Sequence, residues 1–397
     1  MEKIGIFGGS FNPPHIGHIR SAAYAAQTLG LTKLLLIPTR QTPGKPLPEY
    51  SAGDAQRLEM LRLAVGQEPN MEVSDLELRE EGLTWETVQR VADTYPGAKL
   101  YLLLGTDMFQ KFPQWKNARE ILKHTVLVAL RRGEKKEAQT LEKTRALLEE
   151  MGGAVELLSN PTVAISSTQL RRLIAFRAGQ EFLNPQVLSY IQKEKLYDSG
   201  VNFRNLPMPE LEKVVVRLLN PNRVNHVLGC RDTAVELARR WGADETDAGR
   251  AGLLHDITKA LDGPLQLTLC AAYGKMLDDF SRKYPKTLHA LTGSLVAQRI
   301  FGENEAVVSA IESHTTGKAN MNLLETIIYV ADYMEPNRDF PGVEKLRDLA
   351  FSDIRGALKL GLEMTLEHLA EQGGEVSPAS REALAFLNNA APNHIEI

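Results

Sequence analysis

In the first half of the chain, short runs of apolar residues alternate with longer segments in which apolar residues recur every three or four positions. The short runs predict buried strands, and the longer segments predict helices. Strands that alternate with helices favour a doubly wound parallel sheet, an α/β fold with helices on both faces. We expect strands at Lys3–Phe7, Leu34–Ile37, Lys99–Leu104, Thr125–Leu130 and Val155–Leu158, and helices at His18–Leu29, Asp54–Val65, Thr84–Thr94 and Glu137–Met151.

The pattern changes after Tyr197. The next segment, DSGVNFRNLPMPE, contains Gly, Asn and two prolines without a regular period, which is typical of a linker. Beyond it the apolar repeats are helical, so we expect an all-α fold, with helices at Leu211–Leu219, His226–Trp241, Ala306–His314 and Leu323–Met334. The predicted parts are a first domain at 1–197, a linker at 198–208, an all-α domain at 209–372 and a C-terminal tail with one short helix at 373–397.

Length and composition agree with two globular domains. A chain of 397 residues is too long for one ordinary core, and its hydrophobic content of 43% is normal for a soluble protein. The net charge of −4 offers no basic excess for binding nucleic acid. Two distant cysteines form no disulfide framework, and no apolar run approaches the length of a membrane span. We expect a cytoplasmic protein without nucleic-acid or membrane partners. The sequence is compatible with an oligomer.

The loop after the first predicted strand has residues suited to binding phosphate. Ligands of parallel sheets bind beyond the carboxyl ends of the strands, so GGSFNPPHIGHIR at residues 8–20 is a candidate site. Gly8 and Gly9 allow close backbone approach, and the following helix offers free N–H groups. His15 and His18 share one face of the first helical turn and can donate to phosphate oxygens. The alternative is that two surface histidines merely flank a glycine.

This loop resembles the (T/S)-x-x-H-x-G-H signature of the nucleotidyltransferase superfamily, which has a Rossmann-like fold. A second element of that signature is similar to ISSTQLRR at residues 165–172. There Ser166, Ser167 and Thr168 would cap a helix. The resemblance implies that these residues and Arg171 face the triphosphate of a nucleotide. Taken alone, the segment would be an ordinary capped helix with a basic flank.

Two further segments resemble the bacterial nicotinate-nucleotide adenylyltransferases, and this likeness spans residues 2–195. LLGTDMFQKFPQW at 103–115 resembles the family's (I/L)-G-x-D…W segment, and GLTWETVQR at 82–90 is similar to its S-Y-T-x-x-T-L region. The resemblance places Asp107 near the ribose of the nucleotide and Trp115 against the pyridine ring. It implies transfer of an adenylyl group from ATP, bound with Mg2+, to nicotinate mononucleotide.

The sequence departs from this family at three places. It has Pro43-Gly44-Lys45 where P-H-K is usual and Trp85 where tyrosine is usual, and it lacks the usual arginine–proline–glycine form before Arg132-Gly133. All three lie near the mononucleotide side, so the donor ATP is better supported than the acceptor. We predict His15, His18 and Arg171 as catalytic residues and a nucleotide site made of Gly8, Gly9, Ser10, Phe11, Lys45, Gly105, Asp107, Trp115, Ser166, Ser167 and Thr168.

In the second half, four of the nine histidines of the chain lie on or at the ends of predicted helices, together with two aspartates. Imidazole and carboxylate ligands suit first-row transition metals. A bridging aspartate could hold two ions about 3.5–4 Å apart, as in two-metal phosphatases. Each histidine taken singly is more often a satisfied core residue. The predicted metal ligands are His226, His255, Asp256, His289, His314 and Asp332.

The order H…HD…D and the flanking residues resemble the HD superfamily of phosphohydrolases. His289 and His314 resemble the added ligands of its two-metal members. The segments HTTG and ADYMEPNR resemble the bacterial HD-type symmetrical diadenosine tetraphosphate hydrolases, and this likeness covers residues 208–370. The resemblance implies hydrolysis of diadenosine tetraphosphate to two ADP, with two transition-metal ions, expected to be iron.

Two cations near these ligands could contribute to the same chemistry. Lys259 lies one helical turn from His255 and Asp256 and could neutralise a phosphate, and Arg338, after Asp332, could reach a second one. Each could equally be a solvated surface charge. We predict Asp256 and Lys259 as the catalytic residues of this half.

The sequence leaves three functions open. The first is a bifunctional enzyme that joins the adenylyltransferase to the hydrolase. The second keeps the hydrolase but gives the transferase another phosphorylated acceptor, such as a phosphopantetheine-like compound or a sugar phosphate. The third makes one half a non-catalytic, nucleotide-binding regulatory module, which the occupied ligand and phosphate-contact positions of both halves disfavour.

Overall fold

The computed structural model describes residues 1–40, 51–79, 83–131 and 137–389. The chain forms two compact units, Met1–Val201 and Asn202–Ile397. The domain limits predicted above remain predictions. None of the helices in the described residues combines the length and the apolar composition that crossing a membrane requires.

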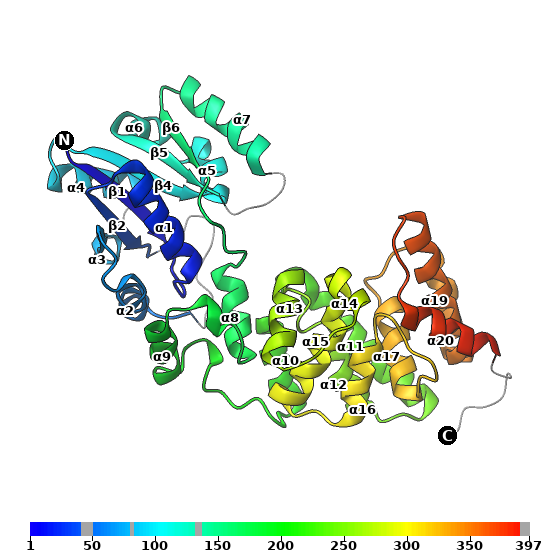
Figure 1. Ribbon diagram of the computed structural model, residues 1–397. Helices are drawn as coiled ribbons and strands as arrows, with labels where there is room; N and C mark the ends of the chain where they lie inside the picture. Colours follow the sequence, from blue (N-terminus) through cyan, green and yellow to red (C-terminus); the bar gives the residue numbers. More distant parts are fainter. Residues whose placement is uncertain (41–50, 80–82, 132–136, 390–397) are drawn as a thin grey trace. The chain divides into compact units, whose positions relative to one another are not determined.

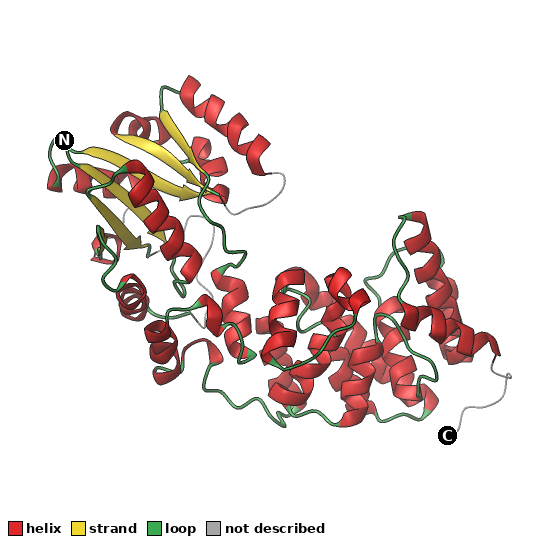
Figure 2. Cartoon of the chain, in the orientation of Figure 1, coloured by secondary structure: helices red, strands yellow, loops and turns green. Residues whose placement is uncertain are grey.

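The first unit is built on a sheet of six parallel strands (Figure 2). Its order is β3-β2-β1-β4-β5-β6, with β1 and β4 at the centre. Five strands were predicted, and β3 was missed because it has only three residues, none of which is buried. The strands are β1 (Lys3–Gly9), β2 (Lys33–Pro38), β3 (Met71–Val73), β4 (Lys99–Gly105), β5 (Thr125–Leu130) and β6 (Ala154–Leu158).

Helices cover both faces of this sheet, as the alternation of strands and helices predicts. Successive side chains of a strand point to opposite faces, so alternate residues enter separate cores. Ile4 and Ile6 pack in the core under one set of helices, and Phe7 packs in the core under the other. The first set is α4 (Thr84–Thr94), α5 (Thr106–Lys111), α6 (Ala118–His124) and α7 (Glu137–Glu150), and the second is α1 (Ile16–Leu29) and α2 (Asp54–Val65).

A third, smaller core lies beside the sheet, where α2 packs against the last helices of the unit. It joins Met60 of α2 to Leu170, Val187 and Tyr197, residues that are far apart in the sequence. The short helix α3 (Leu76–Arg79) precedes α4. The helices of this region are α8 (Ser167–Ala175) and α9 (Pro185–Lys193), followed by the short turn η3 (Leu196–Asp198). This core brings the C-terminal end of the unit next to α2.

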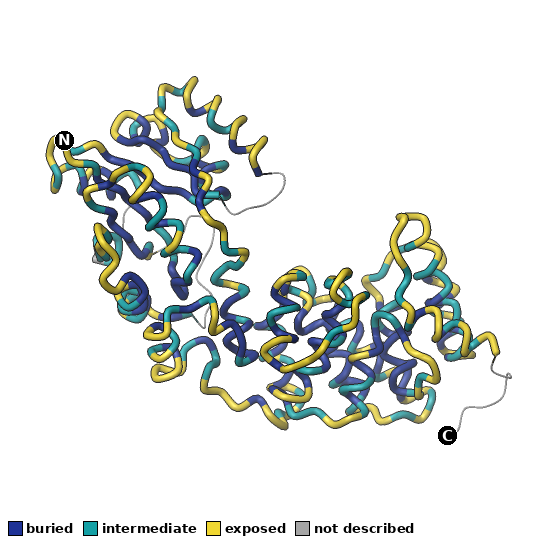
Figure 3. The backbone as a smooth tube through the Cα atoms, in the orientation of Figure 1, coloured by how far each residue is buried: buried dark blue, intermediate teal, exposed yellow. Residues whose placement is uncertain are grey.

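The described part of the second unit is entirely helical, as predicted (Figure 1). Helix α17 is buried along most of its length, and it contacts α11, α12 and α16 (Figure 3). The helices are α10 (Met208–Leu218), α11 (Val224–Trp241), α12 (Glu245–Leu254), α13 (Gly263–Ala272), α14 (Asp279–Lys283), α15 (Leu288–Val296), α16 (Glu305–Ser313), α17 (Leu323–Met334), α18 (Val343–Ser352), α19 (Ile354–Glu371) and α20 (Pro378–Asn389).

Candidate active sites

The first candidate site begins where β1 ends. The chain leaves Gly9, passes through a short loop and enters α1, for which His15 is the N-cap residue. The backbone N–H of His15 donates to Nδ1 of His18 at 3.2 Å, and the two ring centroids lie 3.7 Å apart. Because Nδ1 of His18 accepts, a neutral His18 carries its proton on Nε2 and can donate from there. Two imidazoles therefore stand together at a helix N-terminus, where anions bind favourably.

The loop between β1 and α1 is tightly packed. Phe11 is buried, with its ring edge-on to Phe7 at 5.6 Å and to His18 at 5.1 Å. A Cβ atom on Gly9 would come within 3.2 Å of the Phe11 ring, whereas a Cβ atom on Gly8 would meet only Thr39, at 3.7 Å. A side chain at Gly9 would therefore crowd the Phe11 ring, whereas Gly8 has room for a Cβ atom.

The second predicted element lies directly against this loop. Ser166 is the N-cap residue of α8 and accepts from the backbone N–H of Gln169. The hydroxyl of Ser167 donates to the carbonyl oxygen of Pro13 at 2.9 Å. The buried Arg171 donates to the carbonyl oxygen of Asn12 at 2.7 Å and to the Thr168 hydroxyl at 3.2 Å. The structure thus brings these two segments together, while direct contact of Arg171 with a triphosphate stays a prediction.

The predicted acceptor residues follow β4, the direct neighbour of β1 in the sheet. Gly105 is the N-cap residue of α5, and Asp107 lies in its first turn. Trp115 packs on Phe112, with 5.1 Å between ring centroids, and lies partly buried on the core. Because β1 and β4 are parallel, these residues lie at the same end of the sheet as the His15 loop, beyond the carboxyl ends of the strands. The predicted Lys45, its neighbours Pro43 and Gly44, and the pair Arg132-Gly133 lie outside the described residues.

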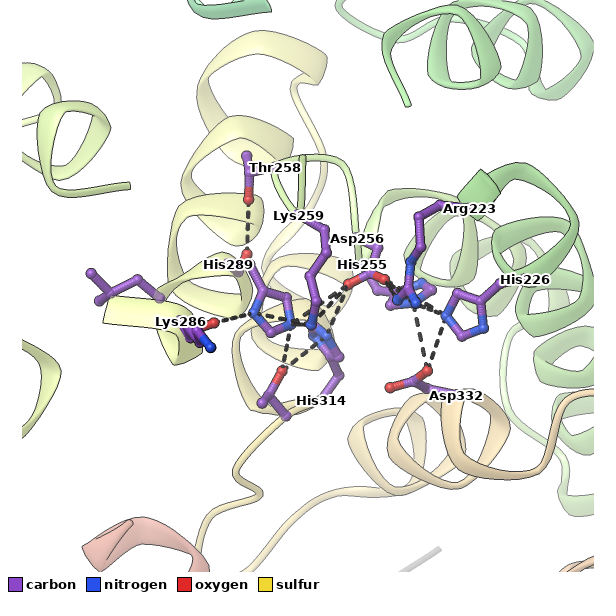
Figure 4. A network of polar contacts seen from close by, with 12 residues as sticks. Arg223, His226, His255, Asp256, Thr258, Lys259, Lys286, His289, His314 and Asp332 are labelled. Atoms are coloured by element: carbon purple, nitrogen blue, oxygen red, sulfur yellow. Dashed lines mark hydrogen bonds and ion pairs between the residues drawn. The ribbon is translucent and has the colours of Figure 1, made fainter. Parts of the chain in front are cut away.

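The second candidate site lies inside the helical unit, where six side chains from five places in the chain converge (Figure 4). All except Asp332 are buried. They are the six predicted ligands: His226 on α11, His255 and Asp256 directly after α12, His289 on α15, His314 directly after α16, and Asp332 on α17.

The carboxylate of Asp256 lies between two groups of imidazoles. Its Oδ2 is 3.7 Å from Nε2 of His226 and 3.6 Å from Nε2 of His255. Its Oδ1 is 3.5 Å from Nε2 of His289 and 3.8 Å from Nε2 of His314. Asp332 completes the first group, with Oδ1 3.2 Å from Nε2 of His226. The arrangement offers two neighbouring ligand sets that share one aspartate.

Hydrogen bonds fix the orientation of the four imidazoles. In His255, His289 and His314, Nδ1 lies 2.8, 2.9 and 2.7 Å from the carbonyl oxygen three residues earlier. In His226, Nδ1 lies 3.1 Å from a carboxylate oxygen of Glu335. Each of these partners is an acceptor, so Nδ1 carries the proton and Nε2 presents a lone pair to the centre. In this tautomer Nε2 is the nitrogen that can bind a metal ion.

The protonation states also suit metal binding. Burial lowers the pKa of His255 to about 4 and that of His289 to about 3, so both imidazoles are neutral at pH 7. Burial opposes the ionisation of Asp256, but the neighbouring His255, His314 and Lys259 outweigh it and hold the pKa of this carboxyl well below its usual range. Neutral imidazoles and ionised carboxylates are the forms that bind divalent ions.

Two arginines pair with the carboxylates of the centre. Arg338 donates from Nη2 to Oδ1 of Asp332 at 2.6 Å, and Arg223 pairs with Asp256. Arg223 was missed in the sequence, although it lies only three residues before His226. A metal ion bound to these carboxylates would compete with the arginines for the same oxygens, which would make both guanidiniums available to phosphate groups.

Lys259 and Thr315 lie at the other ligand set. Nζ of Lys259 is 2.8 Å from Nε2 of His289, and burial lowers the pKa of this ammonium group. The Thr315 hydroxyl lies 2.9 Å from Nε2 of His289 and 3.1 Å from Nε2 of His314. An ammonium group and a hydroxyl group therefore stand directly beside the imidazoles of this ligand set.

Glu335 is a further residue that the sequence analysis did not identify. Its side chain is buried, and Oε1 forms the hydrogen bond with Nδ1 of His226. Oε2 accepts from the backbone N–H and the side-chain Nδ2 of Asn337, both at 2.8 Å. A Cβ atom on Gly229 would come within 2.4 Å of this second oxygen, so α11 needs glycine where the glutamate approaches. Glu335 is the glutamate of the segment ADYMEPNR, but the sequence alone does not show that it contacts a histidine.

Replacing Glu335 by glutamine is expected to weaken metal binding by roughly 10–100-fold. Asn337 already donates two N–H groups to Oε2, so the new amide would turn its own NH2 toward His226. His226 would then accept at Nδ1 and lose the Nε2 lone pair. Competition with a chelator measures the affinity. Glu325→Gln, at a buried glutamate on α17, is the matched control, and equal affinities in the two variants would contradict this role.

Comparison with known proteins covers both units. A cytidylyltransferase-like family model matches residues 6–173, and an HD domain model matches residues 223–337. The chain is 30% identical, over 371 residues, to the probable nicotinate-nucleotide adenylyltransferase/Ap4A hydrolase of Mycoplasma pneumoniae, covering 92% of this chain and 98% of that protein.

Each half also has separate relatives. The chain is 34% identical over 203 residues to the probable nicotinate-nucleotide adenylyltransferase of Neisseria meningitidis serogroup B, which covers 50% of this chain and 100% of that protein. It is 39% identical over 171 residues to a symmetrical bis(5'-nucleosyl)-tetraphosphatase of Halalkalibacterium halodurans, which covers 43% of this chain and 89% of that protein.

Proposed function

The chain belongs to the family of nicotinate-nucleotide adenylyltransferase/Ap4A hydrolase proteins, and we propose that its two units carry the two activities which that name joins. The first unit transfers the adenylyl group of ATP to nicotinate mononucleotide and releases pyrophosphate, which gives deamido-NAD. The second unit hydrolyses diadenosine tetraphosphate to two ADP and depends on divalent metal ions. The chain is therefore a bifunctional enzyme that acts on adenine nucleotides in both halves.

The observation that carries the hydrolase is the six-residue centre. Its donors are four imidazole Nε2 atoms and two carboxylates, a set that suits first-row transition metals, and we expect iron. His226, His255 and Asp332 would hold one ion, His289 and His314 the other, and Asp256 would serve both. Bound ions of this kind polarise phosphate and lower the pKa of water. Arg223, Lys259 and Arg338 would bind the phosphate oxygens of the substrate.

The transferase is supported by the loop after β1. A phosphate oxygen of nicotinate mononucleotide attacks the α-phosphorus of ATP, and the bond to pyrophosphate breaks. Negative charge grows on the leaving group, and His18 can donate to it from Nε2. The N-termini of α1 and α8 add backbone N–H groups at the same place. Mg2+ is expected to accompany ATP, and Asp107 and Trp115 are expected to bind the acceptor.

Two assays on the purified full chain test this proposal. Pyrophosphate release from ATP is measured with nicotinate mononucleotide, a phosphopantetheine-like acceptor or a sugar phosphate. ADP release from diadenosine tetraphosphate is measured separately. A preference for another acceptor would replace the first half of the proposal and leave the second intact. Protein that contains no metal and leaves diadenosine tetraphosphate unchanged would refute the second half.

Removal of transition metals is expected to separate the two activities. A chelator selective for transition metals, in the presence of excess Mg2+, should reduce hydrolysis by roughly 100-fold or more. The reason is that the centre loses the ions that polarise phosphate and activate water. Adenylyl transfer should stay within about twofold, since its histidine His18 acts as a hydrogen-bond donor. Elemental analysis of the treated protein confirms the removal. Equal loss of both activities would contradict separate metal requirements.

A further inference from the structure

Three polar side chains from different parts of the first unit hold the phosphate loop from one side. Arg57 of α2 donates from Nη1 to the carbonyl oxygen of Ser10 at 2.7 Å. The hydroxyl of Tyr197, in η3, donates to Oδ1 of Asn12 at 2.6 Å. Arg171 of α8 donates to the carbonyl oxygen of Asn12, as described above. The loop of residues 10–12 is thus anchored at its backbone and at its asparagine side chain.

Arg57 is an unusual residue in this position. Its side chain has 0% exposure, whereas its ion-pair partner Asp54, 2.7 Å away, is 42% exposed. Full burial of a guanidinium is costly and rare. The core beside the sheet, which includes Met60, provides apolar packing and no reason for a cation. In the described part of the chain, the only backbone oxygen to which Arg57 donates is that of Ser10. The buried charge is therefore used to hold the loop.

The contact with Ser10 has a geometric consequence. In a trans peptide the carbonyl oxygen and the following N–H point in opposite directions. Because Arg57 binds the Ser10 oxygen, the N–H of Phe11 points away from α2. Phe11 also has a φ of 42°, a left-handed conformation that L-residues seldom adopt without support. Arg57 therefore fixes a peptide whose N–H group faces the side opposite to the buried arginine.

Tyr197 secures the same loop through Asn12. The tyrosine is 4% exposed, and burial raises the pKa of its hydroxyl, so this group remains a protonated donor. Oδ1 of Asn12 also receives the backbone N–H of Ala52 at 3.4 Å, and its Nδ2 donates to the Ser51 hydroxyl at 2.8 Å. These bonds use both ends of the asparagine amide and leave it one orientation.

We propose that Arg57 and Tyr197 are positioning residues for adenylyl transfer, which hold the Ser10–Asn12 loop in the conformation that receives the phosphates of ATP. This inference rests on the proposed transferase activity. Neither residue is proposed to touch substrate. Both act through the loop, so their loss changes the use of ATP and spares the use of the acceptor.

The test uses the full chain with the variants Arg57→Lys and Tyr197→Phe. Lysine keeps the charge but lacks the planar fork that reaches Ser10 and Asp54 together, and phenylalanine removes only the hydroxyl. Each variant is expected to raise the KM for ATP or the Kd for Mg-ATP by about tenfold, the loss that follows when a hydrogen bond to a buried partner is removed. The KM for the acceptor should change by less than about twofold, because the acceptor residues follow β4.

Two controls distinguish positioning from damage to the fold. Arg62→Gln changes an exposed arginine of the same helix and should leave both constants unchanged. Diadenosine tetraphosphate hydrolysis by the other unit reports the amount of folded protein in each sample. Equal changes in the constants for ATP and acceptor, or a lower melting temperature with unchanged ATP constants, would overturn the inference. A wild-type chain that binds Mg-ATP without transferring the adenylyl group would refute the proposed activity only. Calorimetry would still measure the effect of each variant on the Kd for Mg-ATP.

Discussion

Diadenosine tetraphosphate hydrolysis is expected to be lost when Asp256 is replaced by asparagine. Asp256 places one carboxylate oxygen near each imidazole group, and asparagine offers one oxygen and one NH2 in the same volume. An amide nitrogen is a donor and cannot serve as a ligand, so one of the two sets loses its shared carboxylate. Changes of outer-shell partners already cost 10–100-fold, so a loss above about 100-fold in kcat is expected here.

The measurement is release of ADP, combined with metal analysis of the purified variant. Adenylyl transfer in the same sample should keep its wild-type rate, which shows that the chain is folded. Asp279→Asn, at an exposed aspartate of α14, is the matched control. Full metal content with hydrolysis within a few-fold of wild type would show that Asp256 is not the shared ligand.

Adenylyl transfer is expected to be lost when His18 is replaced by alanine. His18 can donate from Nε2 because its Nδ1 accepts the backbone N–H of His15. Removing one donor to developing charge in a transition state typically costs 10²–10³ in kcat, and we expect a decrease of about that size. The capping bond to His15 is lost too, at a cost of about 1 kcal/mol in folding stability. This is too little to unfold the unit.

Pyrophosphate release at saturating ATP measures this effect, and hydrolysis by the second unit is the internal reference. Gln27→Ala, at an exposed position of α1, is the matched control. If the variant retains its kcat and changes only in melting temperature, His18 serves to cap α1 and does not stabilise the transition state.

Most elements of the fold were predictable because their patterns are local. Asp54–Val65, Thr84–Thr94 and Leu323–Met334 were predicted with the bounds that the structure has. The strand Met71–Val73 was missed, because three residues are too few to show a period and its pairing with β2 supplies what its own sequence lacks. Local periodicity can identify an element that buries its own face, but it cannot identify a short edge strand.

The six side chains that meet in the helical centre were predictable because their residue types indicate metal chemistry. The residues that support them do not. Glu335 and Arg223 are ordinary charges in the sequence, and their roles depend on partners 109 and 33 residues away. Arg57 and Tyr197 lie 47 and 185 residues from the loop atoms that they contact. Such pairings follow from the packing of helices against each other, which a single sequence does not specify.

The two sites use histidine in opposite hydrogen-bonded forms. In the helical centre carbonyl and carboxylate oxygens hold the proton on Nδ1, whereas at His18 a backbone N–H keeps Nδ1 deprotonated. The hydrogen-bond partner of Nδ1 therefore determines which histidines present a lone pair at Nε2 to a metal ion. A transition metal added in excess should partition to the helical centre, because at His18 it would have to displace the proton on Nε2. One polypeptide can thus keep a site suited to binding metal ions apart from a site suited to donating hydrogen bonds, by the tautomers of their histidines.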